Sequence, residues 1–156
     1  MRVLLTGMSG TGKSTLVQEL RRRGFAAYDA DDHGFSEPRG CGRWGWRRDV
    51  VAALLADHGE GLLFFAGCSE EQADLPFDFR VLLTAPEALL VSRLSARTDN
   101  PYGQTSSELA QVLGDRAEIE PLLRRSADLV LTTTAPPAQL ADAVLASIAE
   151  RDARDT

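Results

Sequence analysis

The sequence has little cysteine and no long apolar run, and both shortages narrow the class of protein. Its two cysteines, Cys41 and Cys68, lie far apart and outside any Cys-x-x-Cys motif, so neither a disulfide framework nor a zinc site is expected. No apolar run approaches the roughly 18 residues that a membrane span needs. The first residues also lack the layout of a secretory signal peptide. We therefore expect a cytoplasmic protein with reduced thiols and no membrane partner.

Lysine is the scarcest of the charged residues. Lys13 is the one lysine among 17 lysines and arginines. GTP switches usually read guanine with an Asn-Lys-x-Asp stretch, and this chain has no second lysine to place in one. The net charge of −6 also argues against nucleic acid as a partner. Both features disfavour a GTP switch and a general nucleic-acid binder.

Length and hydrophobic patterning indicate one domain that spans residues 1–156. Of these residues, 44% are hydrophobic, which is enough for a core of its own. Short apolar runs alternate with helical patterns, and this alternation predicts a three-layer α/β/α domain with a five-stranded parallel sheet. The expected strands are 2–6, 25–29, 62–66, 80–84 and 129–133, and the expected helices are 13–23, 49–58, 86–97, 106–125 and 137–150.

A glycine-rich motif joins the first expected strand to the first expected helix. Residues 7–14 read GMSGTGKS and fit the pattern G-x-x-x-x-G-K-[ST]. Glycines let backbone N–H groups turn inward around an anion, and the following helix adds its positive N-terminal end. The motif predicts a site for a nucleoside triphosphate, with Lys13 on the β- and γ-phosphates and Ser14 on Mg²⁺. The residues expected to bind the nucleotide are Gly7, Ser9, Gly10, Thr11, Gly12, Lys13, Ser14 and Thr15.

Carboxylates follow the second expected strand rather than the third. Motor and AAA-type ATPases usually carry an apolar strand that ends in a carboxylate, but here the run 62–66 leads into Gly67 and Cys68. The run 25–29 instead ends in Asp29, and Asp31 follows two residues later. Phosphoryl transfer needs a metal ion to offset charge and a carboxylate to take the hydroxyl proton. Two carboxylates at this place are chemically consistent with these needs, and the kinase interpretation itself comes from the resemblance described next.

With these motifs the chain resembles small P-loop kinases of the shikimate kinase and gluconate kinase type, which are related to nucleoside monophosphate kinases and include AAA-family ATPase-type members. The resemblance implies a P-loop NTPase fold with a substrate side at about residues 32–60. It implies that Asp29 supports Mg²⁺ and that Asp31 binds or activates the acceptor hydroxyl. It also places Gly67 beside the substrate, because shikimate kinases have a glycine cluster at the end of that strand.

The resemblance extends to the segment before an expected lid. Residues 93–98 are similar to the family pattern R-x-x-x-R-T, whose second arginine, here Arg97, lies on the adenine or near the phosphates. The stretch 98–106 is then a short lid that excludes water. The loop around Pro136 falls where the family packs adenine. Unlike the lid of shikimate kinases, this stretch has no basic residue, and Arg116 is the candidate to replace the missing arginine.

The substrate side is rich in arginine and tryptophan. Arg43 and Arg47 are candidates to pair with an anionic acceptor, and Trp44 or Trp46 is a candidate to stack on a ring. An exposed basic turn with one tryptophan anchored in the core fits the same residues equally well. The acceptor itself therefore stays open at this point.

The leading hypothesis is a small-molecule kinase. It transfers the γ-phosphate of Mg-ATP to a hydroxyl or phosphate of a small acceptor, with Lys13, Asp31 and Arg97 as catalytic residues and either a monomer or a homodimer as the active form. Two alternatives stay open. One is a kinase of nucleic-acid 5′-hydroxyl ends, and the other is a regulator that binds ATP and hydrolyses it slowly without an acceptor.

Overall fold

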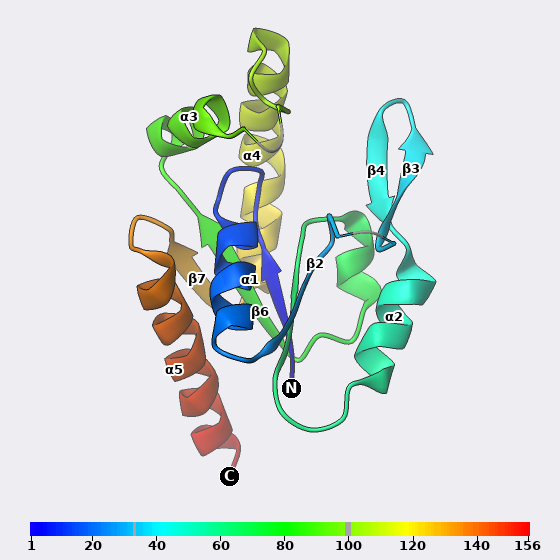
Figure 1. Ribbon diagram of the computed structural model, residues 1–156, viewed down its shortest axis with the longest axis vertical. Helices are drawn as coiled ribbons and strands as arrows, with labels where there is room; N and C mark the ends of the chain where they lie inside the picture. Colours follow the sequence, from blue (N-terminus) through cyan, green and yellow to red (C-terminus); the bar gives the residue numbers. More distant parts are fainter. Residues whose placement is uncertain (33, 99–100) are drawn as a thin grey trace.

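A parallel β-sheet forms the centre of the structure, a computed structural model that describes residues 1–32, 34–98 and 101–156. Its strands are β1 (Arg2–Thr6), β2 (Ala26–Asp29), β5 (Leu63–Ala66), β6 (Phe79–Thr84) and β7 (Leu129–Thr132). They lie in the order β2-β5-β1-β6-β7 (Figure 1). In the central strand, Val3 pairs with Phe64 on one side and with Phe79 on the other. The predicted five-stranded parallel sheet is confirmed.

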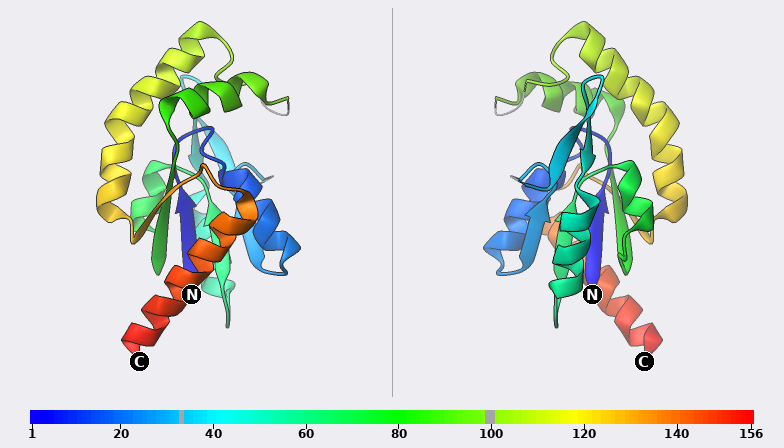
Figure 2. Two further views of the ribbon diagram at one scale, coloured as in Figure 1. Left: turned by 90° about the vertical axis from the view of Figure 1, so that its left-hand side faces the viewer. Right: turned by 90° about the vertical axis from the view of Figure 1, so that its right-hand side faces the viewer.

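Helices cover both faces of this sheet (Figure 2). They are α1 (Lys13–Arg22), α2 (Arg48–Asp57), α3 (Glu87–Ala96), α4 (Ser106–Ser126) and α5 (Pro137–Asp155). Side chains alternate across a strand, so Val3 and Leu5 pack with buried residues of α1 and α5, whereas Leu4 packs on the opposite face with residues of α2. The predicted three layers are therefore confirmed. In the described ranges no helix has the length and apolar character to cross a membrane.

A β-hairpin that was not predicted projects from the substrate side (Figure 1). It consists of the antiparallel strands β3 (Ser36–Gly40) and β4 (Arg43–Trp46). Trp46 is 3% exposed and packs edge-on against Phe65, with ring centroids 5.0 Å apart. Trp44, nearer the tip, is 68% exposed. The hairpin is thus anchored in the core at its base and open to solvent above it.

Two short segments complete the rim of the sheet. The 3-10 helix η1 (Glu70–Asp74) follows β5 and contacts β4. Before α4, Thr105 forms a capping box in which its hydroxyl accepts a hydrogen bond from the Glu108 N–H at 3.2 Å. The expected lid, 98–106, ends at this cap, and residues 99–100 of it lie outside the described residues.

Candidate functional site

The loops that follow β1, β2, β5 and β7 meet at one edge of the sheet, because the carboxyl ends of parallel strands lie together. With the hairpin and parts of α3 and α4 they enclose a cleft of ≈ 860 Å³. Most of the predicted site residues line this cleft. They are Gly7, Ser9, Gly10, Gly12, Lys13, Ser14, Thr15, Asp29, Asp31, Gly67 and Arg97.

The glycine-rich loop is closed tightly, and its lysine lies over it. A Cβ atom on Gly7 would lie 2.3 Å from the carbonyl oxygen of Leu83 in β6, so only glycine fits there. Lys13 Nζ donates to the carbonyl oxygens of Gly7 at 2.6 Å and Met8 at 2.9 Å. Burial lowers the pKa of the Lys13 ammonium, and the negative groups nearby oppose this shift. The Lys13 ammonium, the backbone N–H groups of the loop and the start of α1 therefore all favour an anionic ligand at this place.

Two further side chains fix the shape and position of this loop. Thr11 is fully buried, and its hydroxyl donates to the Met8 carbonyl oxygen at 2.8 Å, so it shapes the loop and does not line the cleft. Arg93 Nη1 donates to the carbonyl oxygen of Gly10 at 3.1 Å and to Thr133 Oγ1 at 2.9 Å. Arg93 therefore connects the loop to the end of β7.

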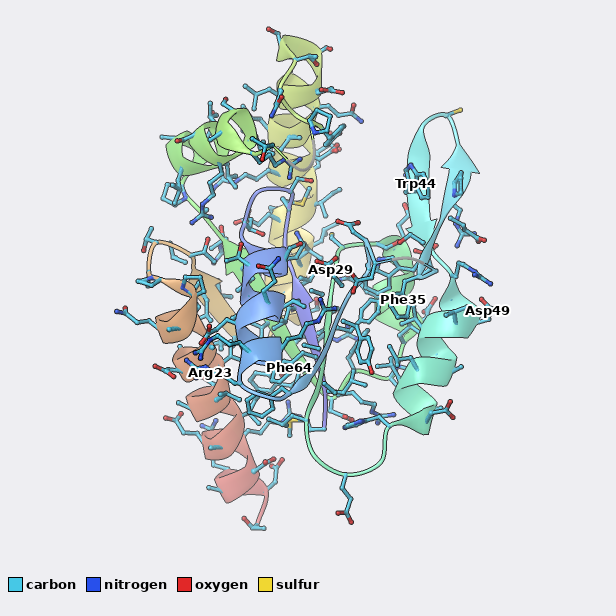
Figure 3. The ribbon with its side chains drawn as sticks, viewed as in Figure 1. Arg23, Asp29, Phe35, Trp44, Asp49 and Phe64 are labelled. Atoms are coloured by element: carbon cyan, nitrogen blue, oxygen red, sulfur yellow. The ribbon has the colours of Figure 1, made fainter. Side chains whose placement is uncertain are left out.

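Asp29 is held rigidly at the end of β2 (Figure 3). It is 9% exposed, and its Oδ2 accepts a hydrogen bond from Ser14 Oγ at 2.5 Å. Its Oδ1 accepts from the Asp31 N–H at 2.9 Å, and its own N–H donates to Asp32 Oδ2 at 3.1 Å. Asp32 in turn forms an ion pair with Arg21 at 2.6 Å. This network presents the Ser14 hydroxyl and the Asp29 carboxylate as one unit.

The Ser14–Asp29 unit fits Mg²⁺ in company with phosphate oxygens. Within the part of the chain that the structure describes, no group of three or more His, Cys, Asp or Glu side chains is placed to hold a metal ion. Mg²⁺ usually keeps several waters and takes one or two protein oxygens together with phosphate oxygens. One hydroxyl and one carboxylate at hydrogen-bond distance are donors of that kind.

Asp31 differs from Asp29 in that its carboxylate has no partner in the part of the chain that the structure describes. It is exposed within the cleft and, among the described residues, accepts no hydrogen bond and forms no ion pair. The cleft walls partly desolvate the Asp31 carboxylate and so raise its pKa, and the neighbouring charge of Asp29 raises it further, whereas the charge of Lys13 opposes the rise. A carboxylate with a raised pKa and no partner is suited to accept a proton.

The two arginines considered for the phosphates lie in different places. Arg97 lines the cleft, and its Nη2 donates to the Tyr102 carbonyl oxygen at 2.6 Å. Its buried Nε has no hydrogen-bond partner among the described residues. Arg116 donates to the Ala85 carbonyl oxygen at 2.9 Å and pairs with Glu120 at 3.3 Å. It lines a separate hollow beside α4. The geometry therefore corrects the idea that Arg116 replaces the missing lid arginine.

On the substrate side Gly67 lines the cleft, whereas the predicted Arg43 and Arg47 lie outside it. A Cβ atom on Gly67 would lie 2.7 Å from Ala30 Cβ and 2.8 Å from the Trp46 ring, so Gly67 permits close packing at the cleft floor. Arg43 is 74% exposed and lies 3.6 Å from Glu70. Arg47 Nη1 donates to the Gly34 carbonyl oxygen at 3.4 Å. Neither arginine lines the cleft, contrary to the expectation that they face an acceptor.

The opposite end of the cleft has an apolar wall. Ala135, Pro137 and Leu140 line it, whereas the predicted Pro136 precedes α5 and does not. The loop expected at the adenine therefore lines the cleft through the two neighbours of Pro136, and not through Pro136 itself. The side chains of this wall have the apolar character that a nucleotide base needs for packing.

Four further residues that line the cleft were not predicted, and two of them lie just after the ends of strands. The four are Ser36, Cys68, Asp115 and Thr133. Cys68 and Thr133 follow the ends of β5 and β7, and the rule that strand ends line a ligand cleft could have found both. Ser36 and Asp115 come from the hairpin and from α4, and no signal in the sequence marks them.

The fold resembles that of several small kinases. A shikimate kinase from Acinetobacter baumannii in complex with shikimate aligns with a TM-score of 0.68 and 20% identity, covering 96% of this chain and 93% of that one. A gluconokinase from Sinorhizobium meliloti 1021 aligns with a TM-score of 0.60 and 19% identity, covering 96% and 91%. The chain thus has the α/β fold of the small P-loop kinases.

The family is shown by the sequence match. Residues 3–114 match the AAA_18 family, described as an AAA domain, and the chain belongs to this family. It is also 28% identical over 144 residues to a nucleotide-binding protein from Rhodospirillum rubrum, covering 88% of this chain and 44% of that protein. The chain therefore spans less than half the length of this curated relative. Fold and family together define a small P-loop kinase-like protein.

Proposed function

We propose that this protein is an ATP-dependent phosphotransferase that acts on a small molecule. The observation that carries the proposal is the free carboxylate of Asp31 beside the hydrogen-bonded Ser14–Asp29 unit and the Lys13 ammonium, all in one cleft. A P-loop that only hydrolyses nucleotide has no need of a second, unpaired carboxylate at this position. A kinase uses such a group to receive the proton of its acceptor.

The phosphate side of the reaction is assigned to the loop. Backbone N–H groups of residues 7–14 and Lys13 hold the β- and γ-phosphates, and the apolar wall at Ala135 packs on the base. When bound by Ser14 and Asp29, Mg²⁺ supplies positive charge that offsets the phosphate charge. Arg97 lines the same cleft and is assigned to the transferred phosphate, because a guanidinium forks onto phosphate oxygens.

Asp31 is assigned to the acceptor. The acceptor hydroxyl oxygen forms a bond to the γ-phosphorus while the bond from that phosphorus to the β,γ-bridging oxygen breaks. The hydroxyl proton passes to Asp31, and ADP leaves with the bridging oxygen. No further reactant is needed for this balance.

The test is ATP consumption with and without acceptors. Purified protein with Mg²⁺ is assayed against nucleosides, nucleoside monophosphates, sugar acids, sugars, shikimate and 5′-hydroxyl oligonucleotides. We expect one class of small molecule to raise turnover well above the acceptor-free rate, and chelation of Mg²⁺ to abolish it. Lys13→Ala should lower transfer by about 10²–10³-fold, the loss that follows removal of one charge-stabilising donor.

Three outcomes would count against the proposal. Turnover that no acceptor raises indicates an ATP-hydrolysing regulator. Turnover raised by oligonucleotides alone, with strong salt dependence, indicates a nucleic-acid end kinase. Full transfer by Lys13→Ala, with circular dichroism like that of the wild type, removes the loop from the reaction.

A further inference from the structure

The part of the cleft beyond Asp31 has no positive charge among the described residues. We call it the acceptor end, and it is formed by Asp31, Ser36, Trp44, Gly45, Trp46, Gly67 and Cys68. The Ser36 hydroxyl is engaged, because it donates to the Ala30 carbonyl oxygen at 2.7 Å. Asp31 is therefore the charged group that an acceptor meets there.

None of the four arginines in residues 39–48 lines the cleft, and three of them pair with acidic residues of η1. The pairs are Arg39–Glu71 at 3.0 Å, Arg43–Glu70 at 3.6 Å and Arg48–Asp74 at 3.8 Å. Exposed ion pairs of this kind contribute little stability, but their positions show where the guanidinium groups lie. The basic character of residues 39–48 thus belongs to the outer surface of the hairpin.

The cations of the cleft lie at its phosphate end. Lys13 contacts the glycine-rich loop, Arg93 contacts Gly10 and Thr133, and Arg97 contacts Tyr102. A bound triphosphate engages these groups and adds its own negative charge next to Asp31. The charges of Lys13 and Arg97 reach Asp31, but a bound triphosphate occupies both cations. A carboxylate or phosphate on the acceptor would then face two sources of negative charge with no cation left for it. Like charges placed together cost affinity.

Because the acceptor end has no cation among the described residues, the Trp44 ring is the surface available to recognise the acceptor. It lines the cleft, although 68% of it is exposed, and an indole face attracts flat rings, the C–H face of sugars and cations. We infer that the acceptor is a hydroxyl compound without negative charge, neutral or cationic, that rests a flat or apolar face on Trp44. This inference rests on the proposed function and specifies its substrate class.

The experiment compares acceptors that share a carbon skeleton and differ in charge. One set is gluconate, glucitol and 1-amino-1-deoxyglucitol; a second is shikimate and methyl shikimate; a third is adenosine 5′-monophosphate and adenosine. Phosphorylated product is measured by mass spectrometry beside ATP consumption. We expect the neutral or cationic member of at least one set to have a kcat/KM about tenfold or more above that of its anionic counterpart.

Two variants of neighbouring residues separate the cleft from the outer surface. Trp44→Arg places a cation in the acceptor end and should shift the preference toward the anionic member of the same set. Arg43→Ala removes a cation that lies outside the cleft and should leave the preference of the wild type unchanged. Both side chains are largely exposed, so both variants should fold.

Each outcome decides the inference. Preference for the non-anionic members, reversed by Trp44→Arg, supports it. Preference for the anionic members, or equal use of both, overturns the inference and leaves the kinase activity standing. Loss of transfer to an anionic acceptor in Arg43→Ala also overturns it, because the arginine would then bind substrate. If no acceptor of either charge is phosphorylated, the proposed function fails and the inference fails with it.

Discussion

The phosphate end and the acceptor end of the cleft are built in opposite ways. At the phosphate end the side chains that hold the loop already have partners: the Thr11 hydroxyl donates within the loop, and Arg93 connects the loop to Thr133. At the acceptor end Asp31 has no partner among the described residues, and Trp44 is mostly exposed. A triphosphate is the same in every reaction of this kind, so a rigid site suits it, whereas the acceptor end leaves its groups free for a ligand.

The two ends also differ in what supports them. The glycine-rich loop of the phosphate end follows the central strand β1, and its Gly7 packs directly on β6. The acceptor end depends on a hairpin that reaches the core through Trp46. Changes at the two ends should therefore have different consequences for transfer, for stability and for acceptor choice.

The largest expected effect comes from Asp31→Asn, at the boundary between the two ends. Asparagine has nearly the same shape but cannot take a proton at neutral pH. We expect transfer to fall by about 10²–10⁴-fold, the usual contribution of a general base. Nucleotide affinity should stay close to that of the wild type, because the nucleotide contacts assigned here lie at the phosphate end. Transfer is measured by product formation and affinity by calorimetry.

Asp32→Asn is the matched control for this variant. Asp32 is the adjacent carboxylate, but it is engaged by Arg21 and the Asp29 N–H, and an amide oxygen can still accept from both. We expect a much smaller loss of transfer. Equal losses in the two variants, or full activity of Asp31→Asn, would remove Asp31 from the role of base.

The second effect concerns the two tryptophans of the hairpin. Trp46→Ala should lower the free energy of unfolding by about 3–5 kcal/mol, because it empties a buried, fully packed position. Trp44→Ala should change it by less than about 0.5 kcal/mol, since its side chain is largely exposed. Chemical denaturation measures both values. Similar losses for the two variants would show that the hairpin is not anchored through Trp46.

Much of the phosphate end could be predicted from the sequence, because its signals are local. The apolar run of β1 and the pattern from Gly7 to Ser14 lie within the first fifteen residues. Asp29 and Asp31 follow the next strand, and all parallel strands end at the same edge of the sheet. Strand periodicity, one motif and the resemblance to small P-loop kinases were therefore enough to predict that these groups lie together.

The acceptor end could not be predicted in the same way, because its arrangement depends on residues far apart in the sequence. Residues 36–40 read SEPRG, which is polar and contains proline, so nothing marks them as a strand before they pair with β4. Arg43 was expected to face the substrate, but Glu70 of η1 lies beside it on the outer surface. Nothing in the sequence indicated that η1, with its acidic residues, would lie beside the hairpin.

The smallest expected effect tests a tightly packed backbone position of the acceptor end. Gly67→Ala forces a methyl group against Ala30 and Trp46 and should cost about 1–3 kcal/mol of the free energy of unfolding. Gly114→Ala is the control, because a Cβ there meets nothing within 4 Å and the residue lies in the exposed interior of α4. It should stabilise the protein by about 0.5–1 kcal/mol. Opposite shifts in the denaturation midpoint would show that the acceptor end, although open to solvent at Trp44, is as closely packed around Gly67 as the phosphate end is around Gly7. Equal shifts would show that Ala30 and Trp46 move to accommodate the added methyl group.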